Sequence, residues 1–461
     1  PSRTMLLLLA LVASFSIATP CQQPPKPLSL PEAVARALAK YPSLRVSRER
    51  EVASQAAVDL ARTAYLPSLT ALWQGNRATR NNIFGQVLPQ SIIPPISGPV
   101  LPTTSGQGAT GSAAGVLLSW EVFDFGYRSA GVTAARAGQN ISGAEIKIAQ
   151  LDLGLAAANA FINLVAAQEL TRAAQSNVER RQVFDKAVHV LVDNELRPGA
   201  EASRADAELA AARIALIQSQ TSEHVARVAL ATLLGVPPES IVVDSATLLQ
   251  SPPSESAQET QIQLHPLALA QNARVGLADS QIAVLDRGYL PHIFFQGSLS
   301  GRGSGANNDG SFAAFSDGLT LQRRNWAAGV TATFAAGDWF SLRARKRGAE
   351  ANRRAEAARY EQTVDDLNGQ VAQARAALDG ARQVAENTPF ELKAAQDGER
   401  QARARYDAAL TTVVEVAEAQ NVLIRAEIDD ALARLNVWRS MAAVAAAQGD
   451  LSPFISAAGG H

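Results

Sequence analysis

The chain contains an internal repeat, and this feature constrains its fold more than any single motif does. Segment 41–67 begins with Tyr41-Pro42 and ends with Tyr65-Leu66-Pro67, while segment 265–291 begins with His265-Pro266 and ends with Tyr289-Leu290-Pro291. Further similarities follow downstream at a nearly constant offset, so the sequence predicts one structural unit that is present twice. We expect a secretory leader at 1–21, a first repeat at 22–262, and a second repeat with a C-terminal tail at 263–461.

The N-terminal segment has the pattern of a secretory leader. Arg3 precedes the apolar run from Met5 to Ala18, which is too short to cross a bilayer as a helix, and Ser16-Ile17-Ala18 offers small residues for cleavage. The only cysteine, Cys21, follows this run. It is either a plain thiol in a discarded or flexible segment or a lipid-modified N-terminus, although Pro20 stands where bacterial lipoproteins have a small residue. After the leader no apolar run reaches about 18 residues, so a membrane role would require strands.

Four short windows alternate between apolar and polar residues, which is typical of β-strands with two different faces. Intervening residues such as Ser119 and Thr331 fit an aqueous face. The faces that fit lipid carry Leu69, Ala71 and Trp73 in the first window, Val116, Leu118, Trp120 and Val122 in the second, Phe295, Gly297 and Leu299 in the third, and Val330, Ala332 and Phe334 in the fourth.

A single window of this kind also fits a strand of a soluble sandwich. Four of them, with Trp73, Trp120 and Trp326 near their ends like an aromatic girdle, favour a membrane β-barrel. Four strands cannot close a barrel, because even small membrane barrels use about eight. A barrel here would therefore be shared between subunits.

The rest of the chain has the pattern of long helices. Good helix formers run without proline from Tyr127 to Asn194, Leu196-Arg197-Pro198-Gly199 interrupts them, and a second helix is expected to return over 200–234. The second repeat predicts helices over 341–406 and 412–447, with a bend at Pro389. Helices of this kind also suit a periplasmic coiled-coil adaptor or scaffold without a membrane barrel. That alternative leaves the strands unexplained.

An ordered set of motifs resembles the TolC-type outer-membrane efflux proteins. These motifs are the entry segment from Leu28 to Pro42, the two Tyr-Leu-Pro endings, Trp120-Glu121-Val122-Phe123-Asp124-Phe125-Gly126, and Leu233-Leu234-Gly235-Val236-Pro237. The resemblance implies a mainly α-helical fold with a small β part. It implies a homotrimer with a shared twelve-stranded barrel in the bacterial outer membrane and a long periplasmic helical tunnel. The implied function is the exit duct of a tripartite efflux pump or a type I secretion system, with a periplasmic membrane-fusion adaptor and an inner-membrane pump as partners.

The resemblance also implies a periplasmic gate. The family pattern has two carboxylates three residues apart after the inner helix turn, and Glu415 and Glu418 match them with Glu in place of Asp. Residues three apart share a helix face, so three subunits would form two acidic rings, which would filter for cations. The alternative is a solvated helix face near an N-terminus, where carboxylates are favoured by the helix dipole.

Other gate positions match the family only in part. Tyr406 matches the gate tyrosine, but Thr411 stands where the type member has an arginine. Ala409 replaces the turn glycine, and Ser203 replaces an aspartate in the first repeat. These replacements give no support to a lock that relies on that arginine and that aspartate.

No sequence motif indicates catalysis, a cofactor or a metal. The five histidines are scattered without a recognised metal-ligand spacing, and no serine or cysteine has a nucleophile elbow around it. The formal net charge of -1 gives no reason to expect nucleic acid as a partner. We therefore expect a transport protein and not an enzyme.

Overall fold

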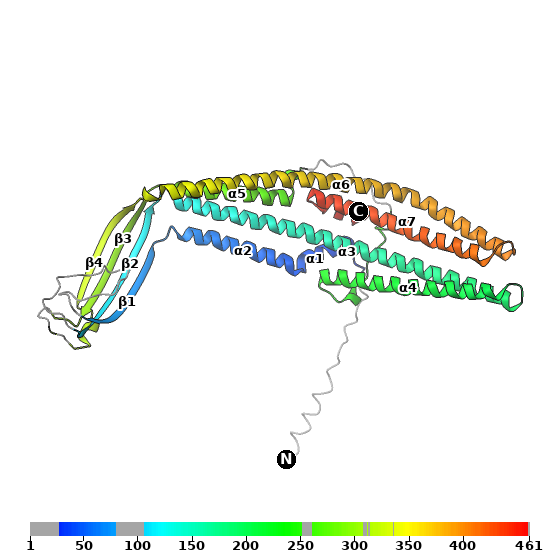
Figure 1. Cartoon of the computed structure of the whole chain (residues 1–461), viewed down its shortest axis with the longest axis horizontal. Helices are drawn as coiled ribbons and strands as arrows, with labels where there is room; N and C mark the ends of the chain where they lie inside the picture. Colours follow the sequence, from blue (N-terminus) through cyan, green and yellow to red (C-terminus); the bar gives the residue numbers. More distant parts are fainter. Residues whose placement is uncertain are drawn as a thin grey trace, which may run out of the picture. The chain divides into compact units, whose positions relative to one another are not determined.

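The computed structural model describes residues 27–79, 106–250, 261–307, 311, 314–334 and 336–459. The leader, Cys21 and most of the Pro-rich segment between the first two strands lie outside the described residues. In the first repeat the elements are α1 (Leu30–Lys40), α2 (Pro42–Thr63), β1 (Ser68–Thr79), β2 (Gly108–Phe123), α3 (Tyr127–Asp193) and α4 (Gly199–Leu234). In the second repeat they are α5 (Pro266–Arg287), β3 (His292–Ser304), β4 (Arg323–Thr333), α6 (Trp339–Asp407), α7 (Val413–Gln448) and α8 (Ser452–Ala458) (Figure 1).

Short 3-10 turns connect several of these elements: η1 (Pro238–Ser240), η2 (Ile262–Leu264), η3 (Asp317–Leu319) and η4 (Ala336–Asp338).

Corresponding elements of the two repeats have nearly equal lengths. Helices α2 and α5 have 22 residues each, α3 and α6 have 67 and 69, and α4 and α7 have 36 each. Both shorter return helices end at a left-handed glycine, Gly235 or Gly449, as helix C-termini commonly do. The long helices predicted from the sequence are therefore confirmed to within two residues at each end. Each of the four strand windows overlaps one strand, but the observed strands are longer than the windows, and β2 begins eight residues before its window.

Two compact units cut across the repeats. One contains the described residues of Pro1–Leu44, Ala149–Ile262 and Leu367–His461, and the other contains those of Arg45–Ile148 and Gln263–Asp366. Each unit thus takes matching parts of both repeats, because α3 and α6 are long enough to run through both units.

The second of these units holds one antiparallel sheet with the strand order β1-β2-β3-β4 (Figure 1). A segment around η3 packs on the ends of β2 and β3, where Gly305 donates its N–H to the carbonyl of Thr110. Gly303 and Gly318 allow this close approach, since a Cβ at either would collide with the backbone of Thr320 or Thr110.

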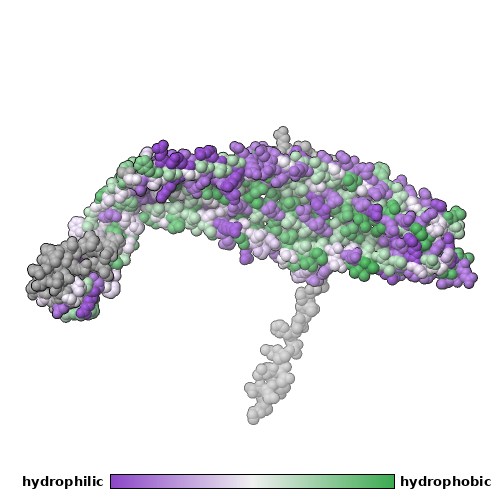
Figure 2. All heavy atoms as spheres, in the orientation of Figure 1, coloured by the Kyte–Doolittle hydropathy of each residue, from purple (hydrophilic) through white to green (hydrophobic). Residues whose placement is uncertain are grey.

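In the same unit, polar side chains join the helices in pairs. Gln139 of α3 donates to Gln55 and Glu51 of α2, and Gln271 of α5 donates to Glu356 of α6. Hydrophilic residues gather along α6 (Figure 2).

The other unit is a helical bundle with an apolar core. A capping box between Ser29 and Glu32 starts α1, which buries Leu30, Ala33, Val34 and Ala37. Trp438 and Phe161 are among its largest fully buried side chains. Helix α6 continues through Pro389, and the neighbouring Thr388 donates its hydroxyl to Asp430 of α7.

Among the described residues, one helix is long and apolar enough to cross a membrane by length and composition alone. It is α3, whose most apolar 18-residue window has a mean hydropathy of 1.4 and is 44% buried. No such segment was expected from the sequence, because the criterion there was an uninterrupted run of apolar residues. A criterion of mean hydropathy also admits segments with one or two charged residues.

Candidate functional site

The register of the sheet places the residues expected to contact lipid, one set from each of the four windows, on the same face of the sheet. Residues opposite each other in antiparallel strands share a face, and the pairs include Leu69 with Leu118, Val116 with Leu299, and Phe295 with Val330. We call this the apolar face; its members are Leu69, Ala71, Trp73, Val116, Leu118, Trp120, Phe295, Gly297, Leu299, Trp326, Val330 and Ala332. The opposite face, the polar face, carries Gln74, Ser119, Gln296, Ser298, Asn325 and Thr331, with one small apolar cluster of Leu72, Ala113 and Leu117.

The apolar face is strongly exposed in the single chain. Trp73 is 73% exposed, Trp326 78% and Val330 71%. Soluble monomers rarely expose a continuous apolar surface of this kind, and such surfaces mark contact with membranes or other proteins. That this face contacts lipid stays a prediction, which the geometry of the face supports.

Two of the residues expected on this face, Val122 and Phe334, have no partner in the observed strand pairing. The β2–β3 register shifts between Glu121 and Phe123, and Phe123 pairs with Ile293. A β-bulge therefore leaves Val122 without a partner and gives Phe123 the position that alternation assigned to Val122. Phe334 follows the end of β4 and is 63% exposed.

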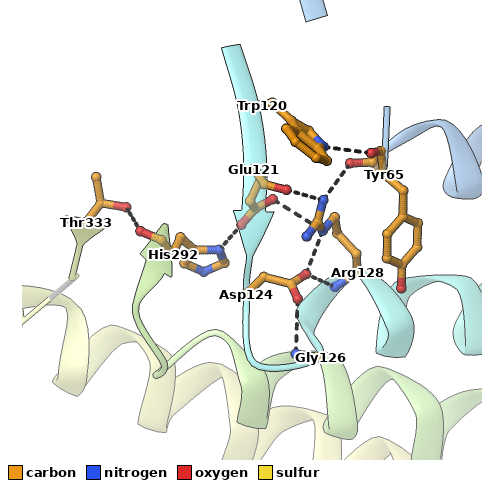
Figure 3. Close-up of polar contacts among 9 residues, drawn as sticks. Tyr65, Trp120, Glu121, Asp124, Gly126, Arg128, His292 and Thr333 are labelled. Atoms are coloured by element: carbon orange, nitrogen blue, oxygen red, sulfur yellow. Dashed lines mark hydrogen bonds and ion pairs between the residues drawn. The ribbon is translucent and has the colours of Figure 1, made fainter. Parts of the chain in front are cut away.

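Arg128 organises the connection from β2 to α3 (Figure 3). Its side chain is 7% exposed, its Nε donates to Asp124 Oδ2 at 2.9 Å, and its Nη1 donates to the carbonyl of Glu121 at 2.6 Å. The guanidinium also lies 4.7 Å from the centre of the Tyr65 ring, and Nη1 donates to the carbonyl of Ala64. One buried arginine thus fastens the end of α2, the end of β2 and the start of α3.

Asp124 neutralises that arginine and also caps the turn. It accepts hydrogen bonds from the backbone N–H groups of Gly126 and Arg128. Burial raises the pKa of the Asp124 carboxyl, but the hydrogen bonds and the charge of Arg128 outweigh burial, and the net pKa is lowered. The turn itself requires positive φ at Phe125 (51°) and at Gly126 (91°).

Three further side-chain contacts lie near Arg128 and link β2 to β3, β4 to β3, and β2 to the segment after α2 (Figure 3). Glu121 Oε1 lies 2.5 Å from His292 Nδ1, and Thr333 donates its hydroxyl to the His292 carbonyl. Trp120 donates its indole N–H to the Tyr65 carbonyl at 3.0 Å. From the sequence, Trp120 and Glu121 were expected only as part of a family motif and, for Trp120, of the lipid-facing side, and none of these side-chain contacts was expected. Arg128 was not singled out, although Asp124 and Glu121 lie only four and seven residues before it.

The two long hairpins, α3–α4 and α6–α7, end in turns of one type. In the first, the Leu196 N–H bonds to the Leu191 carbonyl and Glu195 has φ 60°. In the second, the Leu410 N–H bonds to the Arg405 carbonyl and Ala409 has φ 61°. Both are Schellman-type helix ends, in which the position with left-handed backbone conformation is usually occupied by glycine.

Tyr406 is the centre of a buried cluster at these turns. It is 2% exposed, packs edge-on against Phe184 with ring centroids 5.2 Å apart, and donates its hydroxyl to Glu201 Oε2 at 3.0 Å. Burial first, and then the bond to Glu201, raise the pKa of Tyr406 to about 12. Val413 and Val416 of α7 belong to the same buried cluster.

Arg197 completes this cluster from the first turn. Its guanidinium lies 4.6 Å from the centre of the Tyr406 ring, donates to the carbonyls of Tyr406 and Thr411, and lies 3.7 Å from Glu201. The type member's arginine is absent at Thr411, but Arg197 brings a guanidinium to the same cluster. From the sequence, Arg197 was expected only as part of the break between two helices.

The four expected gate residues divide into two groups. Tyr406 and Thr411 are buried and are connected through Arg197. Glu415 and Glu418 are exposed on α7, and Glu415 Oε2 lies 3.6 Å from Arg405 in a solvent-exposed pair. The two glutamates share a helix face as expected, and their role in a gate stays a prediction.

The two hairpins are also joined farther from the turns. Arg180 of α3 forms a bidentate ion pair with Glu427 of α7, in which Nη1 donates to Oε1 at 3.1 Å and Nη2 donates to Oε2 at 2.8 Å. The buried Arg181 donates to Glu208 of α4 and to Asn421 of α7. These contacts come from both repeats, so the hairpins are held together by charged side chains as well as by the apolar cluster.

Comparison with known proteins gives consistent matches over most of the chain. The sequence model of the family described as outer membrane efflux protein matches residues 33–236 and 259–450. Protein CyaE of Bordetella pertussis is 27% identical over 453 residues, which covers 95% of this chain and 88% of the relative.

Solved structures of outer-membrane channels share the fold. The outer-membrane channel OprN matches with a TM-score of 0.72 at 24% identity, covering 91% of this chain and 89% of that one. The open state of the MtrE outer membrane channel of Neisseria gonorrhoeae matches with a TM-score of 0.70 at 21% identity, covering 92% and 89%.

Proposed function

The chain belongs to the outer membrane efflux protein family, and on that premise we propose that it works as a homotrimer whose three sheets close one barrel in the outer membrane. The family resemblance, the mainly helical fold with a small sheet, the outer-membrane location and the role of an exit duct in efflux, all expected from the sequence, are confirmed. The alternative of a periplasmic adaptor without a membrane barrel is therefore set aside. Relatives of this chain are transport channels.

One observation carries the proposal of a shared barrel: the sheet is open on both sides. Strands β1 and β4 are its edges, and each has only one partner in the described chain. In lipid an unpaired strand edge is too costly, because no water satisfies its backbone N–H and C=O groups. A second and a third copy would close the edges, and four strands from each of three copies give the twelve-stranded barrel that the resemblance implies.

The barrel would place the apolar face toward lipid and the polar face toward the lumen. This orientation supports an aqueous pore that is lined by residues such as Ser119, Gln296 and Thr331. Exposed apolar side chains on the helices, such as Leu60 of α2 and Ile217 of α4, would be covered by neighbouring subunits.

In the same proposal the Tyr406 cluster is the lock at the closed end of the tunnel. Arg197, Tyr406 and Glu201 tie the α3–α4 turn to the α6–α7 turn, so opening would require these contacts to break. Glu415 and Glu418 would form the acidic rings at the constriction. A periplasmic adaptor and an inner-membrane pump would supply the energy and the choice of cargo.

Disulfide trapping in outer-membrane preparations tests the shared barrel. Ala71→Cys in β1 is combined in turn with Ala328→Cys, Val330→Cys and Ala332→Cys in β4, and each single variant serves as the control. We expect at least one pair to give covalently linked trimers after oxidation. Monomers alone from every pair, together with a monomeric mass in native membranes, would refute the trimer.

A further inference from the structure

We propose that Asp185, His189 and Asp206 form a divalent metal site between α3 and α4. One donor atom from each residue lies within 4.8 Å of the other two. His189 Nε2 is 3.1 Å from Asp206 Oδ1 and 3.8 Å from Asp185 Oδ1. The histidines alone show no metal-ligand spacing in the sequence, whereas here the ligands are one histidine and two aspartates.

The fold fixes the backbone that carries these three ligands independently of any ion. Asp185 and His189 are four residues apart on α3, so they share one face of the helix. Asp206 comes from α4, the antiparallel partner in the hairpin. The residues next to them, Phe184, Val188 and Ala205, are buried in the cluster around Tyr406, which fixes the backbone on both helices.

The two distances from His189 fit a transition-metal ion, and the two aspartate oxygens lie within 4.8 Å of each other. Zinc bonds of about 2.0 to 2.2 Å to nitrogen and oxygen place neighbouring ligands of a tetrahedral site about 3.4 Å apart. The two distances from His189 Nε2, 3.1 and 3.8 Å, lie on either side of that value. Three protein ligands leave one position open for water.

Asp185 provides a second and independent observation. Its side chain is only 13% exposed, and its Oδ1 atom is shielded from solvent with no hydrogen-bond donor in the described part of the chain. A shielded carboxylate oxygen without a donor is costly. A His189–Asp206 ion pair by itself leaves this oxygen unsatisfied, because Nε2 lies 3.8 Å away, whereas a bound cation satisfies all three ligands.

The ligand set selects the class of ion. Calcium and magnesium prefer all-oxygen sites, while an imidazole nitrogen together with carboxylates suits Zn²⁺, Cu²⁺ and other first-row divalent ions. The bound ion would clamp α3 to α4 just above their turn. This inference does not depend on the shared barrel or on channel activity.

Zinc titration of the purified full-length protein tests the site. The protein is first stripped with a chelator, and Zn²⁺ binding is then measured by calorimetry at about pH 7.5, where metal competes well with protons for histidine. We expect one ion per chain and a loss of affinity of at least about tenfold in His189→Ala, Asp206→Asn and Asp185→Asn. The matched control is His224→Ala, because His224 is an exposed histidine of α4 outside the cluster; it should bind like the parent.

Spectroscopy supplies a readout that a merely structural role would not change. With Cu²⁺ as the probe, electron paramagnetic resonance should show coupling to a single imidazole nitrogen, and His189→Ala should abolish that coupling. Circular dichroism and oligomer size verify that each variant is folded. Equal zinc binding in His189→Ala and His224→Ala, or unchanged copper coupling in His189→Ala, would overturn the proposal.

Discussion

The hydroxyl of Tyr406 in α6 donates a 3.0 Å hydrogen bond to a carboxylate oxygen of Glu201 in α4, across a sequence separation of 205 residues. Arg197 lies over the face of the same ring and binds the carbonyls of Tyr406 and Thr411. The contact thus joins the turn of the first repeat to the turn of the second.

Replacing Tyr406 by phenylalanine should weaken the lock while keeping the aromatic packing. The variant loses a buried hydrogen bond to a charged group, which contributes about 1.5 to 3 kcal/mol. We expect a lower thermal-unfolding temperature in detergent and a higher resting conductance in planar bilayers. Tyr360→Phe is the matched control, since the Tyr360 hydroxyl makes no hydrogen bond within the described part of the chain; equal behaviour of the two variants would argue against a lock.

The raised pKa of Tyr406 predicts a loss of stability at alkaline pH. Its pKa is about 12 in the folded protein against 10.0 as the ordinary value, so the folded state holds the phenolic proton more tightly. The resulting stability is complete below pH 10 and is lost as the pH rises through the folded value of about 12. Unfolding temperatures measured between these values should fall more steeply for the parent than for Tyr406→Phe. Parallel curves would mean that the phenol titrates normally.

Glu415 and Glu418 should control ion selectivity if they line the constriction. Replacing both by glutamine removes the negative rings and should lower cation over anion selectivity, which the reversal potential in a salt gradient measures. Assembly should be unaffected because both side chains are exposed. Thr411→Ala should change conductance little, since Arg197 contacts the carbonyl of Thr411 and not its hydroxyl. An unchanged reversal potential would assign the glutamates to an ordinary solvated helix face.

Arginine at neighbouring positions of β2 should distinguish the two faces of the sheet. Leu118→Arg places a charge on the apolar face and should destabilise assembly by about 2 to 4 kcal/mol if that position lies near the middle of the bilayer. Ser119→Arg places it on the polar face and should be tolerated. Val330→Arg and Thr331→Arg repeat the comparison in β4. The yield of trimer in outer membranes measures the effect, and equal tolerance on both faces would contradict the lipid assignment.

Ala409→Gly should stabilise the turn between α6 and α7. Ala409 has φ 61°, a left-handed conformation that costs a non-glycine residue about 1 to 2 kcal/mol. Glycine removes this cost, and part of the gain is offset by the greater freedom of glycine in the unfolded chain. We expect a modest rise in unfolding temperature. Ala408→Gly, at a neighbouring position without positive φ, should instead lower it.

Much of the architecture was determined by the sequence alone. The equal spacing of the prolines in segments 41–67 and 265–291 predicted the repeat, and α2 and α5 have the same length. The absence of proline from Tyr127 to Asn194 and the Arg197-Pro198-Gly199 break predicted α3 and α4. Alternation predicted which side chains share a sheet face. These features depend on residues that are close in sequence, where backbone propensity and periodicity act directly.

The tertiary structure alone decided which distant side chains meet. Arg197 reaches Tyr406, and Arg128 joins α2, β2 and α3, only because the elements that carry them pack at one register. The bulge that gives Phe123 the place expected for Val122 depends on pairing with Ile293. Asp185, His189 and Asp206 converge because α3 and α4 are antiparallel. Contacts of this kind depend on how separate elements pack against one another, and local sequence patterns carry no record of that packing.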